Sequence, residues 1–162
     1  MKKYIVVAVT LAATALTGWA QSSANLTLSG TVANNTTIAV VPQAGHNALP
    51  VGTGCTDQLV ANVTEKSNNR LGYKVTLTSA NAGSTSQATL KGAEGSNNDV
   101  VNYSMKYGGT EVTLSSGSAQ VTTSSARTAQ AGVVKALTVT IPESWVNTDT
   151  YSDTLTLTIA VN

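Results

Sequence analysis

Apolar and polar residues alternate along much of this chain with a period of two. The stretch 25–32 shows it most clearly, because its small and apolar positions are strictly separated by Asn, Thr and Ser. These positions are Leu26, Leu28, Gly30 and Val32. A period of two places successive side chains on opposite faces of a β-strand. The pattern therefore predicts a strand with one apolar face at residues 25–32.

Further strands are predicted at residues 36–41, 58–64, 71–79, 87–91, 100–107, 110–114, around Val121, and at 133–141 and 151–161. The segments between them are rich in Gly, Asn and Ser. The polar stretch 65–70 is predicted to be one of these turns, and Gly108-Gly109 is a two-residue link typical of a hairpin. No helix is predicted after the first 24 residues. About nine short strands in succession favour a single antiparallel β-sandwich domain.

Two of these segments show the alternation clearly. In residues 71–79 the buried face is predicted to hold Leu71, Tyr73, Val75 and Leu77. In residues 151–161 one face carries Leu155, Leu157, Ile159 and Val161. Each segment therefore predicts a strand with one face against the core.

Residues 1–24 resemble a signal peptide. Lys2 and Lys3 precede an apolar run, and small residues offer cleavage after Ala20 or Ala24. The apolar run is shorter than the ~20 residues of a membrane-spanning helix. Cleavage after Ala24 would leave 162 − 24 = 138 residues, so we expect one exported domain.

The charge balance gives no reason to expect a polyanionic partner. The chain has nine Lys and Arg, eight Asp and Glu and a formal charge of +1, and removal of the two leader lysines gives 7 − 8 = −1. Such a surface predicts no binding to nucleic acid or to an acidic membrane. Charged residues are only 10% of the chain and Phe is absent, which favours Thr-rich strands over helices.

Candidate chemistry is sparse. Cys55 is the only cysteine and cannot form an internal disulfide, so we expect a buried thiol, with a bridge to another chain as the alternative. His46 is the only histidine and lies in a predicted loop without an acidic neighbour, which disfavours a catalytic triad. Asp149 and Asp153 flank Tyr151 and are interpreted as caps at a strand end rather than ligands of calcium or a glycosidase pair. We expect no enzyme activity, metal or cofactor.

Tyr103 and Tyr107 lie on one face of the predicted strand 100–107. A stripe of this kind is more often part of a core, and we expect that here. The alternative is that these rings stack on a sugar, which would make the protein a monomeric exported carbohydrate-binding or surface-coat module. Replacing Tyr103 by Ala would test this alternative.

The strand predicted at residues 25–32 has two alternative partners. It can fold back on residues 36–41 through Ala33-Asn34-Asn35, because a three-residue connection containing Asn suits a hairpin. It can also complete the sandwich of another molecule, since an unpaired sheet edge accepts an added strand. The pattern alone leaves both open.

Two parts of the sequence resemble fimbrial proteins. Residues 25–32 (Asn-Leu-Thr-Leu-Ser-Gly-Thr-Val) and 38–50 (Ile-Ala-Val-Val-Pro-Gln-Ala-Gly-His-Asn-Ala-Leu-Pro) are similar to the amino-terminal half of α-class chaperone-usher pilins of the colonization-factor type. Residues 151–159 (Tyr-Ser-Asp-Thr-Leu-Thr-Leu-Thr-Ile) resemble both those pilins and the spore coat protein U domain. The chain differs from the family pattern at Thr148-Asp149-Thr150, where a Gly is usual. Cys55 has no partner of the kind found in disulfide-bearing pilins and coat protein U domains, which agrees better with the α-class.

The resemblance implies an immunoglobulin-like domain that lacks its last strand. Residues 25–32 would be the donor strand, 33–35 its linker and 36–162 the pilin-like domain. The acceptor groove would be lined by Ile38, Val40, Leu155, Leu157, Ile159 and Val161. It further implies a periplasmic chaperone, an outer-membrane usher, other copies or related pilins as partners, and a place in a fimbria at the cell surface, in the shaft rather than at a receptor-binding tip.

Overall fold

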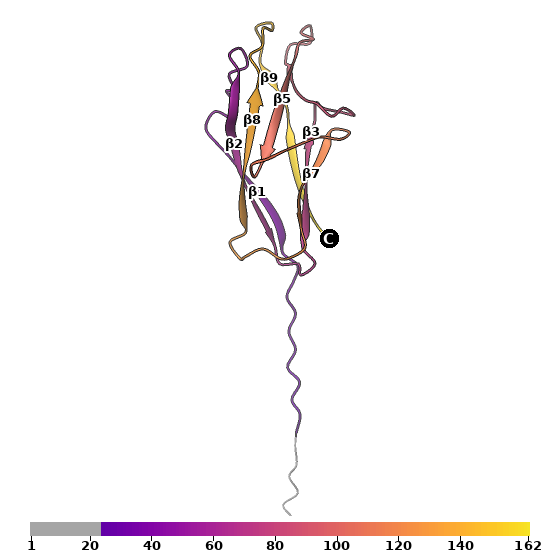
Figure 1. The fold of residues 1–162 in the computed structure, drawn as a ribbon. Coiled ribbons are helices and arrows are strands. Elements are labelled where there is room, and N and C mark those ends of the chain that lie inside the picture. Colours follow the sequence, from indigo (N-terminus) through magenta and orange to yellow (C-terminus); the bar gives the residue numbers. More distant parts are fainter. Residues whose placement is uncertain (1–23) are drawn as a thin grey trace, which may run out of the picture. The chain divides into compact units, whose positions relative to one another are not determined.

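A computed structural model of the protein describes residues 24–162 (Figure 1). The predicted leader lies outside this range except for Ala24. Residues 33–162 form one compact unit, and the chain up to Val32 belongs to a separate one. Residues 24–35 form no strand, and β1 (Thr36–Pro42) pairs with β2 (Cys55–Ser67). The strand predicted at residues 25–32 is therefore not formed within the described chain.

The compact unit is an all-β sandwich of two antiparallel sheets, as predicted (Figure 1). The larger sheet has the strand order β1, β2, β8 (Val133–Ile141), β5 (Val100–Tyr107), β4 (Ala88–Gly92) and β9 (Tyr151–Ser152), and β6 (Thr110–Glu111) is paired to β5. The smaller sheet has the order β10 (Leu155–Val161), β3 (Tyr73–Ser79) and β7 (Ser118–Ser124).

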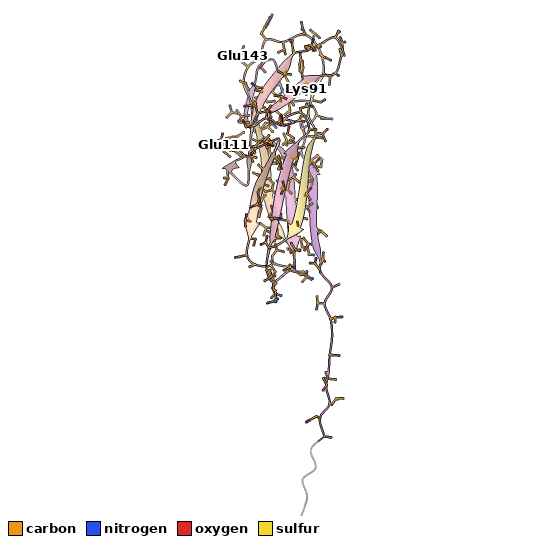
Figure 2. All side chains as sticks on the ribbon, turned by 90° about the vertical axis from the view of Figure 1, so that its right-hand side faces the viewer. Lys91, Glu111 and Glu143 are labelled. Atoms are coloured by element: carbon orange, nitrogen blue, oxygen red, sulfur yellow. The ribbon has the colours of Figure 1, made fainter. Side chains whose placement is uncertain are left out.

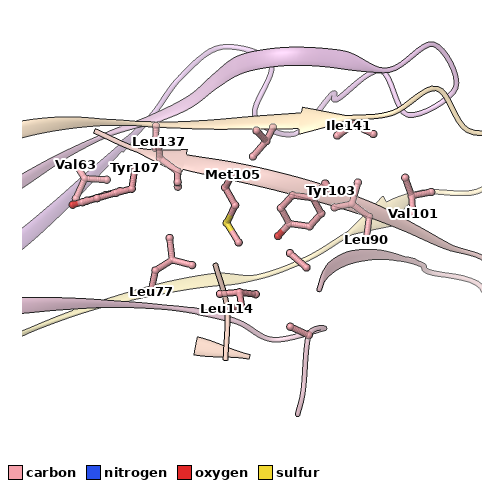
Figure 3. Packing of buried hydrophobic residues seen from close by; sticks show 14 residues of the cluster. Val63, Leu77, Leu90, Val101, Tyr103, Met105, Tyr107, Leu114, Leu137 and Ile141 are labelled. Carbon is pink, nitrogen blue, oxygen red and sulfur yellow. The ribbon is translucent and has the colours of Figure 1, made fainter. Parts of the chain in front are cut away.

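The core lies between the two sheets (Figure 3). Val63, Tyr107, Met105 and Leu137 of the larger sheet approach the opposite layer, from which Leu77 points toward them. All five residues are almost completely buried. This interdigitation of inward-facing side chains explains why the period-two pattern located most strands correctly.

The strand register defines two ends of the sandwich. Thr36 lies opposite Ser67, and Glu65 opposite Val133, at the end that we call basal. The apical end is at the other limit of the same strands. There Pro42 lies opposite Ala61, and Cys55 opposite Ile141. β10 runs from Leu155 at the apical end to Val161 at the basal end.

The prediction of a turn at residues 65–70 is wrong in its first half, because β2 continues to Ser67. Glu65 is fully buried and its carboxylate accepts hydrogen bonds from Tyr107 Oη at 2.7 Å, Thr122 Oγ1 at 2.6 Å and Tyr73 Oη at 3.0 Å. Lys135 Nζ lies 3.6 Å from the same carboxylate. These hydrogen bonds offset the cost of burying a carboxylate inside the sandwich. Because Glu65 is polar, the alternation of apolar and polar residues predicted a turn there instead of a strand.

The prediction of one strand over residues 151–161 is also wrong. β9 pairs with β4 in the larger sheet, and β10 pairs with β3 in the smaller sheet. The chain crosses between the sheets at Asp153-Thr154. The Asp153 carboxylate accepts hydrogen bonds from Ser79 Oγ at 2.6 Å and from the N–H of Asn81 at 3.0 Å, which ties the crossing to the end of β3.

Two smaller differences concern strand ends. β6 covers only Thr110 and Glu111 of the predicted 110–114, although the Gly108-Gly109 hairpin is confirmed by the pairing of Tyr107 with Thr110. β3 begins at Tyr73, so Leu71 precedes it and is 56% exposed. Leu71 follows the alternation but lies beyond the edge of the core.

Candidate assembly groove between two sheet edges

β1 and β10 are edge strands of different sheets and lie side by side. Among the described strands, β1 pairs only with β2 and β10 only with β3. Each therefore presents backbone N–H and C=O groups without a ladder partner along its outer edge. The sandwich is open along this side.

An apolar groove of about 300 Å³ lies at the apical half of this opening. Val40 and Pro42 of β1 line one wall, and Leu155 and Leu157 of β10 line the other. The remaining lining residues come from the core strands, from the loop after β1 and from the crossing between sheets: His46, Leu49, Val60, Ala61, Leu90, Tyr103, Leu137, Val139 and Asp153. An apolar floor between two edge strands suits an extended segment with alternating apolar side chains.

The structure brings some of the predicted acceptor residues into this groove and not others. Val40, Leu155 and Leu157 line it. Ile38 packs against the core next to the groove, Ile159 is half-buried and Val161 is 38% exposed. Since Leu155 opposes Ser79 and Val161 opposes Tyr73, the last two lie progressively closer to the basal end.

Asp153, which the sequence pattern did not place in the groove, holds Tyr103 in the groove floor. Its hydroxyl donates to Asp153 Oδ2 at 2.6 Å. Burial, and then the neighbouring Asp153 carboxylate, raise the pKa of the Tyr103 hydroxyl. Tyr103 is 5% exposed and Tyr107 is 3% exposed, so the prediction that both belong to the core is confirmed. Neither ring is available at the surface to stack on a sugar.

The predicted donor residues are exposed in the described chain. Leu26 is 83%, Leu28 85% and Val32 89% exposed, and residues 24–32 form no secondary structure. Exposed apolar side chains clustered in this way are typical of a segment that binds a partner.

Residues 33–35 were expected to be a linker, but the body holds them firmly. Asn68 Nδ2 donates to Ala33 O at 2.8 Å, and Asn68 Oδ1 accepts from the N–H of Asn35 at 2.7 Å. The N–H of Asn68 in turn donates to Asn35 O at 3.1 Å. We call this set of bonds the Asn68 clamp. It places the joint between the two units at Val32–Ala33.

The other candidate residues occupy unremarkable positions. Cys55 is a free, half-buried thiol that packs against the core at the start of β2. His46 is exposed, with Nδ1 2.9 Å from Gln43 O. Across residues 24–162 no group of three or more His, Cys, Asp and Glu is arranged to hold a metal ion. In the same range no helix is long and apolar enough to cross a membrane.

Trp145 is a surface feature that the period-two pattern did not identify. It lies in the loop between β8 and β9 at the apical end and is 104% exposed. Its neighbour Val146 packs against the core, which anchors the loop that carries it. In the sequence, only the presence of a tryptophan in a predicted loop pointed to this feature, because loops show no regular spacing of apolar residues.

Comparison with known proteins assigns the chain to no family. No protein-family model matches the sequence, and no curated protein matches it.

Proposed function

We propose that the protein is a structural subunit of a cell-surface fimbria. Each copy would insert its residues 25–32 as a donor strand into the groove between β1 and β10 of another copy. The observation that carries this proposal is the open side of the sandwich, where two edge strands flank an apolar groove. The exposed alternating residues Leu26, Leu28 and Val32 are the matching segment in the same chain.

The strand order supports an immunoglobulin-like domain that lacks one strand. Such domains pack a sheet of strands A, B, E and D on a sheet of C, F and G. Across the larger sheet the order β1-β2-β8-β5 corresponds to A-B-E-D. Across the smaller sheet the order β10-β3 corresponds to F-C. The position of strand G, beside β10 and away from β3, has no strand among residues 24–162. A donor strand would fill this position.

Insertion of a strand from another copy is favourable only if burial of the groove's own apolar residues adds to its free energy. Burying Leu26, Leu28 and Val32 stabilises by roughly 1.5 to 3 kcal/mol for each side chain. Each new backbone hydrogen bond adds about 0.5 to 1.5 kcal/mol net. Ordering eight residues costs at least about 1 kcal/mol each, so the inserted strand alone is near balance. The covering of groove residues such as Leu155 and Leu157 would supply the remaining stabilisation.

This function requires partners that keep the groove occupied before assembly. A periplasmic chaperone would cover β10, and an outer-membrane usher would exchange that chaperone for the next subunit. The exported chain would then reside at the cell surface within a filament. A single sandwich domain favours a role in the shaft over that of a two-domain tip adhesin.

The test is polymerisation of the full exported protein with and without residues 25–32. We expect unboiled denaturing gels to show a ladder of subunit multiples that collapses to one band on boiling. Deletion of residues 25–32 should abolish the ladder while leaving a folded, chaperone-bound domain. In this deletion variant, the same eight residues appended after Asn162 through a flexible linker should fill the groove from within and give a stable monomer. We call this variant the self-complemented monomer.

A matched pair of variants separates the apolar face of the segment from its length. Leu26→Ser with Leu28→Ser should abolish the ladder, whereas Thr27→Ala with Ser29→Ala should preserve it. A full-length protein that stays monomeric and folded, with no effect of either pair, would contradict donor-strand assembly.

A further inference from the structure

A cavity of about 270 Å³ lies on the side of the sandwich opposite the groove. It lies between the β5–β6 hairpin and β7. β6 pairs with the edge of β5 that faces away from β1, and β7 is the edge strand of the smaller sheet farthest from β10. Figure 2 shows Glu111, which lines this cavity, on the flank of the body. A strand added between β1 and β10 therefore does not enter this flank cavity.

Hydrogen-bonding side chains make up most of the lining of the flank cavity. Five of the eight lining residues are polar and three are aliphatic: Tyr107, Thr110, Glu111, Thr113 and Gln120, and Val112, Ala119 and Val121. Thr110, Glu111 and Thr113 are exposed, and their side chains form no hydrogen bond within residues 24–162. Gln120 Nε2 donates to Thr123 Oγ1 at 2.7 Å, which leaves Gln120 Oε1 as an acceptor. The lining therefore offers several polar groups to a ligand.

A β-bulge forms one wall of the flank cavity. The pairing of β3 with β7 shifts in register between Val75–Thr122 and Thr76–Gln120, which leaves Val121 without a partner on β3. A bulge of this kind re-aims the side chains around it. Thr122 points into the core, where its hydroxyl donates to Glu65 at 2.6 Å, whereas Gln120 and Val121 both line the cavity. Regular alternation would place only one of these two neighbours there.

The opposite wall is held by the turn and segment that follow β5. Gly108 and Gly109 adopt φ angles of 58° and 83°, which the tight turn requires. The N–H of Val112 donates to Met105 O at 2.9 Å, and Leu114 is buried in the core. These contacts fix the backbone of residues 110–113 without using their polar side chains. The wall is thus preformed.

A second cavity of about 160 Å³ adjoins the first. Glu111, Val112 and Thr113 line both cavities, so the two lie on either side of this short segment. Ser86 and Ser104 add hydroxyl groups to the second one. Two adjoining cavities with a shared central carboxylate suit a ligand of two linked units better than a single small molecule.

The charge of the lining disfavours an anionic ligand. Glu111 is the only charged residue among those that line the two cavities, so no Lys, Arg or His is present to bind an anion. Hydroxyl groups of a neutral sugar can donate to the Glu111 carboxylate and to Gln120 Oε1. The C–H groups of a sugar ring can pack on Val112 and Val121.

An extended peptide suits these cavities less well. Such a peptide requires pockets for alternate apolar side chains, as the groove between β1 and β10 provides. The flank cavity is lined mostly by polar side chains and shares no lining residue with that groove.

We propose that the two cavities form a binding site for a neutral oligosaccharide, with one sugar ring in each cavity and Glu111 between them as the central hydrogen-bond acceptor. The buried rings of Tyr103 and Tyr107 do not stack on the ligand, which is instead held by hydrogen bonds and aliphatic contacts. The site is independent of the proposed assembly, so each copy of the protein would carry one.

Saturation-transfer difference NMR on the full exported protein tests this site, because the method observes the ligand and works for a monomer and a polymer alike. The probes are lactose, cellobiose and diacetylchitobiose at millimolar concentration, with sialic acid as the anionic control. We expect saturation to reach the ring protons of at least one neutral disaccharide and not those of sialic acid.

Substitutions in the shared segment locate the binding. Glu111→Ala should weaken binding of the disaccharide by at least about tenfold, because a hydrogen bond to a charged acceptor is lost, and Glu111→Gln should lose less. Thr113→Trp should abolish binding by filling space in both cavities. Glu143→Ala is the matched control, since Glu143 is an exposed carboxylate that lines neither cavity (Figure 2). Circular dichroism confirms that each variant is folded.

The outcomes separate this site from the assembly proposal. No transfer to any neutral probe, or equal weakening by Glu111→Ala and Glu143→Ala, overturns the oligosaccharide site. Transfer to an uncharged peptide of alternating Thr and Val, and to no sugar, assigns the cavities to an extended peptide and also overturns it. Sugar binding by a protein that forms no ladder supports the site and contradicts donor-strand assembly alone.

Discussion

Asn35 and Asn68 exchange two hydrogen bonds at the point where the amino-terminal segment joins the sandwich. The N–H of Asn35 donates to Asn68 Oδ1 at 2.7 Å, and the N–H of Asn68 donates to Asn35 O at 3.1 Å. One residue thereby holds both Ala33 and Asn35 against the sandwich. The body therefore begins at Ala33, three residues before the first strand.

Asn68→Ala should loosen this joint without unfolding the domain. Loss of the side-chain bonds to Ala33 and Asn35 costs about 1 kcal/mol, so amide exchange at Asn35 should accelerate by about fivefold. Hydrogen exchange followed by NMR measures this directly. Asn69→Ala is the control, since Asn69 Oδ1 accepts from Leu71 rather than from residues 33–35. Equal acceleration in both variants would contradict the clamp.

Glu65→Ala should be strongly destabilising. It leaves the hydroxyls of Tyr73, Tyr107 and Thr122 and the ammonium of Lys135 without their shared buried acceptor, and breaking such a network costs about 3 to 5 kcal/mol. Glu65→Gln retains an acceptor and should lose less.

Urea unfolding of the self-complemented monomer measures both free energies. Glu111→Ala changes an exposed carboxylate on a short strand and should shift the free energy of unfolding by less than about 0.5 kcal/mol. A Glu65→Ala protein as stable as this control would show that the network contributes nothing net.

Asp153→Ala should destabilise the crossing between the sheets. The hydroxyls of Ser79 and Tyr103 would lose their acceptor, with an expected cost of about 2 to 4 kcal/mol in total. Lys106→Ala is a suitable comparison, because Lys106 forms an exposed ion pair with Asp57 at 2.8 Å, and such pairs contribute at most about 1 kcal/mol. Thermal unfolding of both variants distinguishes the two sites, and similar losses would contradict the assigned role of Asp153.

Stability should fall at alkaline pH. Burial, followed by hydrogen bonding and proximity to Glu65, raises the pKa of Tyr73 to about 12. The pKa values of Tyr103 and Tyr107 are also raised, chiefly by burial. Above pH 10 the unfolded chain loses these protons while the folded chain retains them, so the folded state binds more protons and loses stability as pH rises, by about 1.4 kcal/mol per pH unit for each tyrosine.

Unfolding in urea between pH 9 and 11.5 measures this slope. Tyr73→Phe should reduce the dependence of the free energy of unfolding on pH by the contribution of one tyrosine, about 1.4 kcal/mol per pH unit. Absorbance at 295 nm should show that these three phenols do not titrate near pH 10 in the folded domain. Complete titration near pH 10 in the folded protein would contradict their burial.

The period-two pattern predicted the sandwich well because inward-facing residues of both sheets are apolar. The strands at residues 100–107 and 133–141 have the predicted bounds. The pattern failed where a polar residue is buried or where apolar residues continue past the core. Glu65 is a case of the first, and Leu71 of the second.

The groove was predictable only in part. Alternation assigned Leu155 and Leu157 to one wall and Val40 to the other, since these positions follow from the strand faces. The division of residues 151–161 between two sheets depends on the contacts that Asp153 makes with residues far away in sequence, such as Ser79. The exposure of Trp145 emerges only when the loop between β8 and β9 is placed in space.

The pairing of β1 with β2 determines how the domain responds to a mechanical load. All seven residues of β1, from Thr36 to Pro42, have partners on β2, and Ala33 lies directly before this ladder. A pull on Ala33 along the strand axis therefore loads the ladder in shear, so its hydrogen bonds must fail together rather than one after another. The attachment point of the amino-terminal segment thus sets the whole β1–β2 ladder, rather than a single hydrogen bond, against a pulling force.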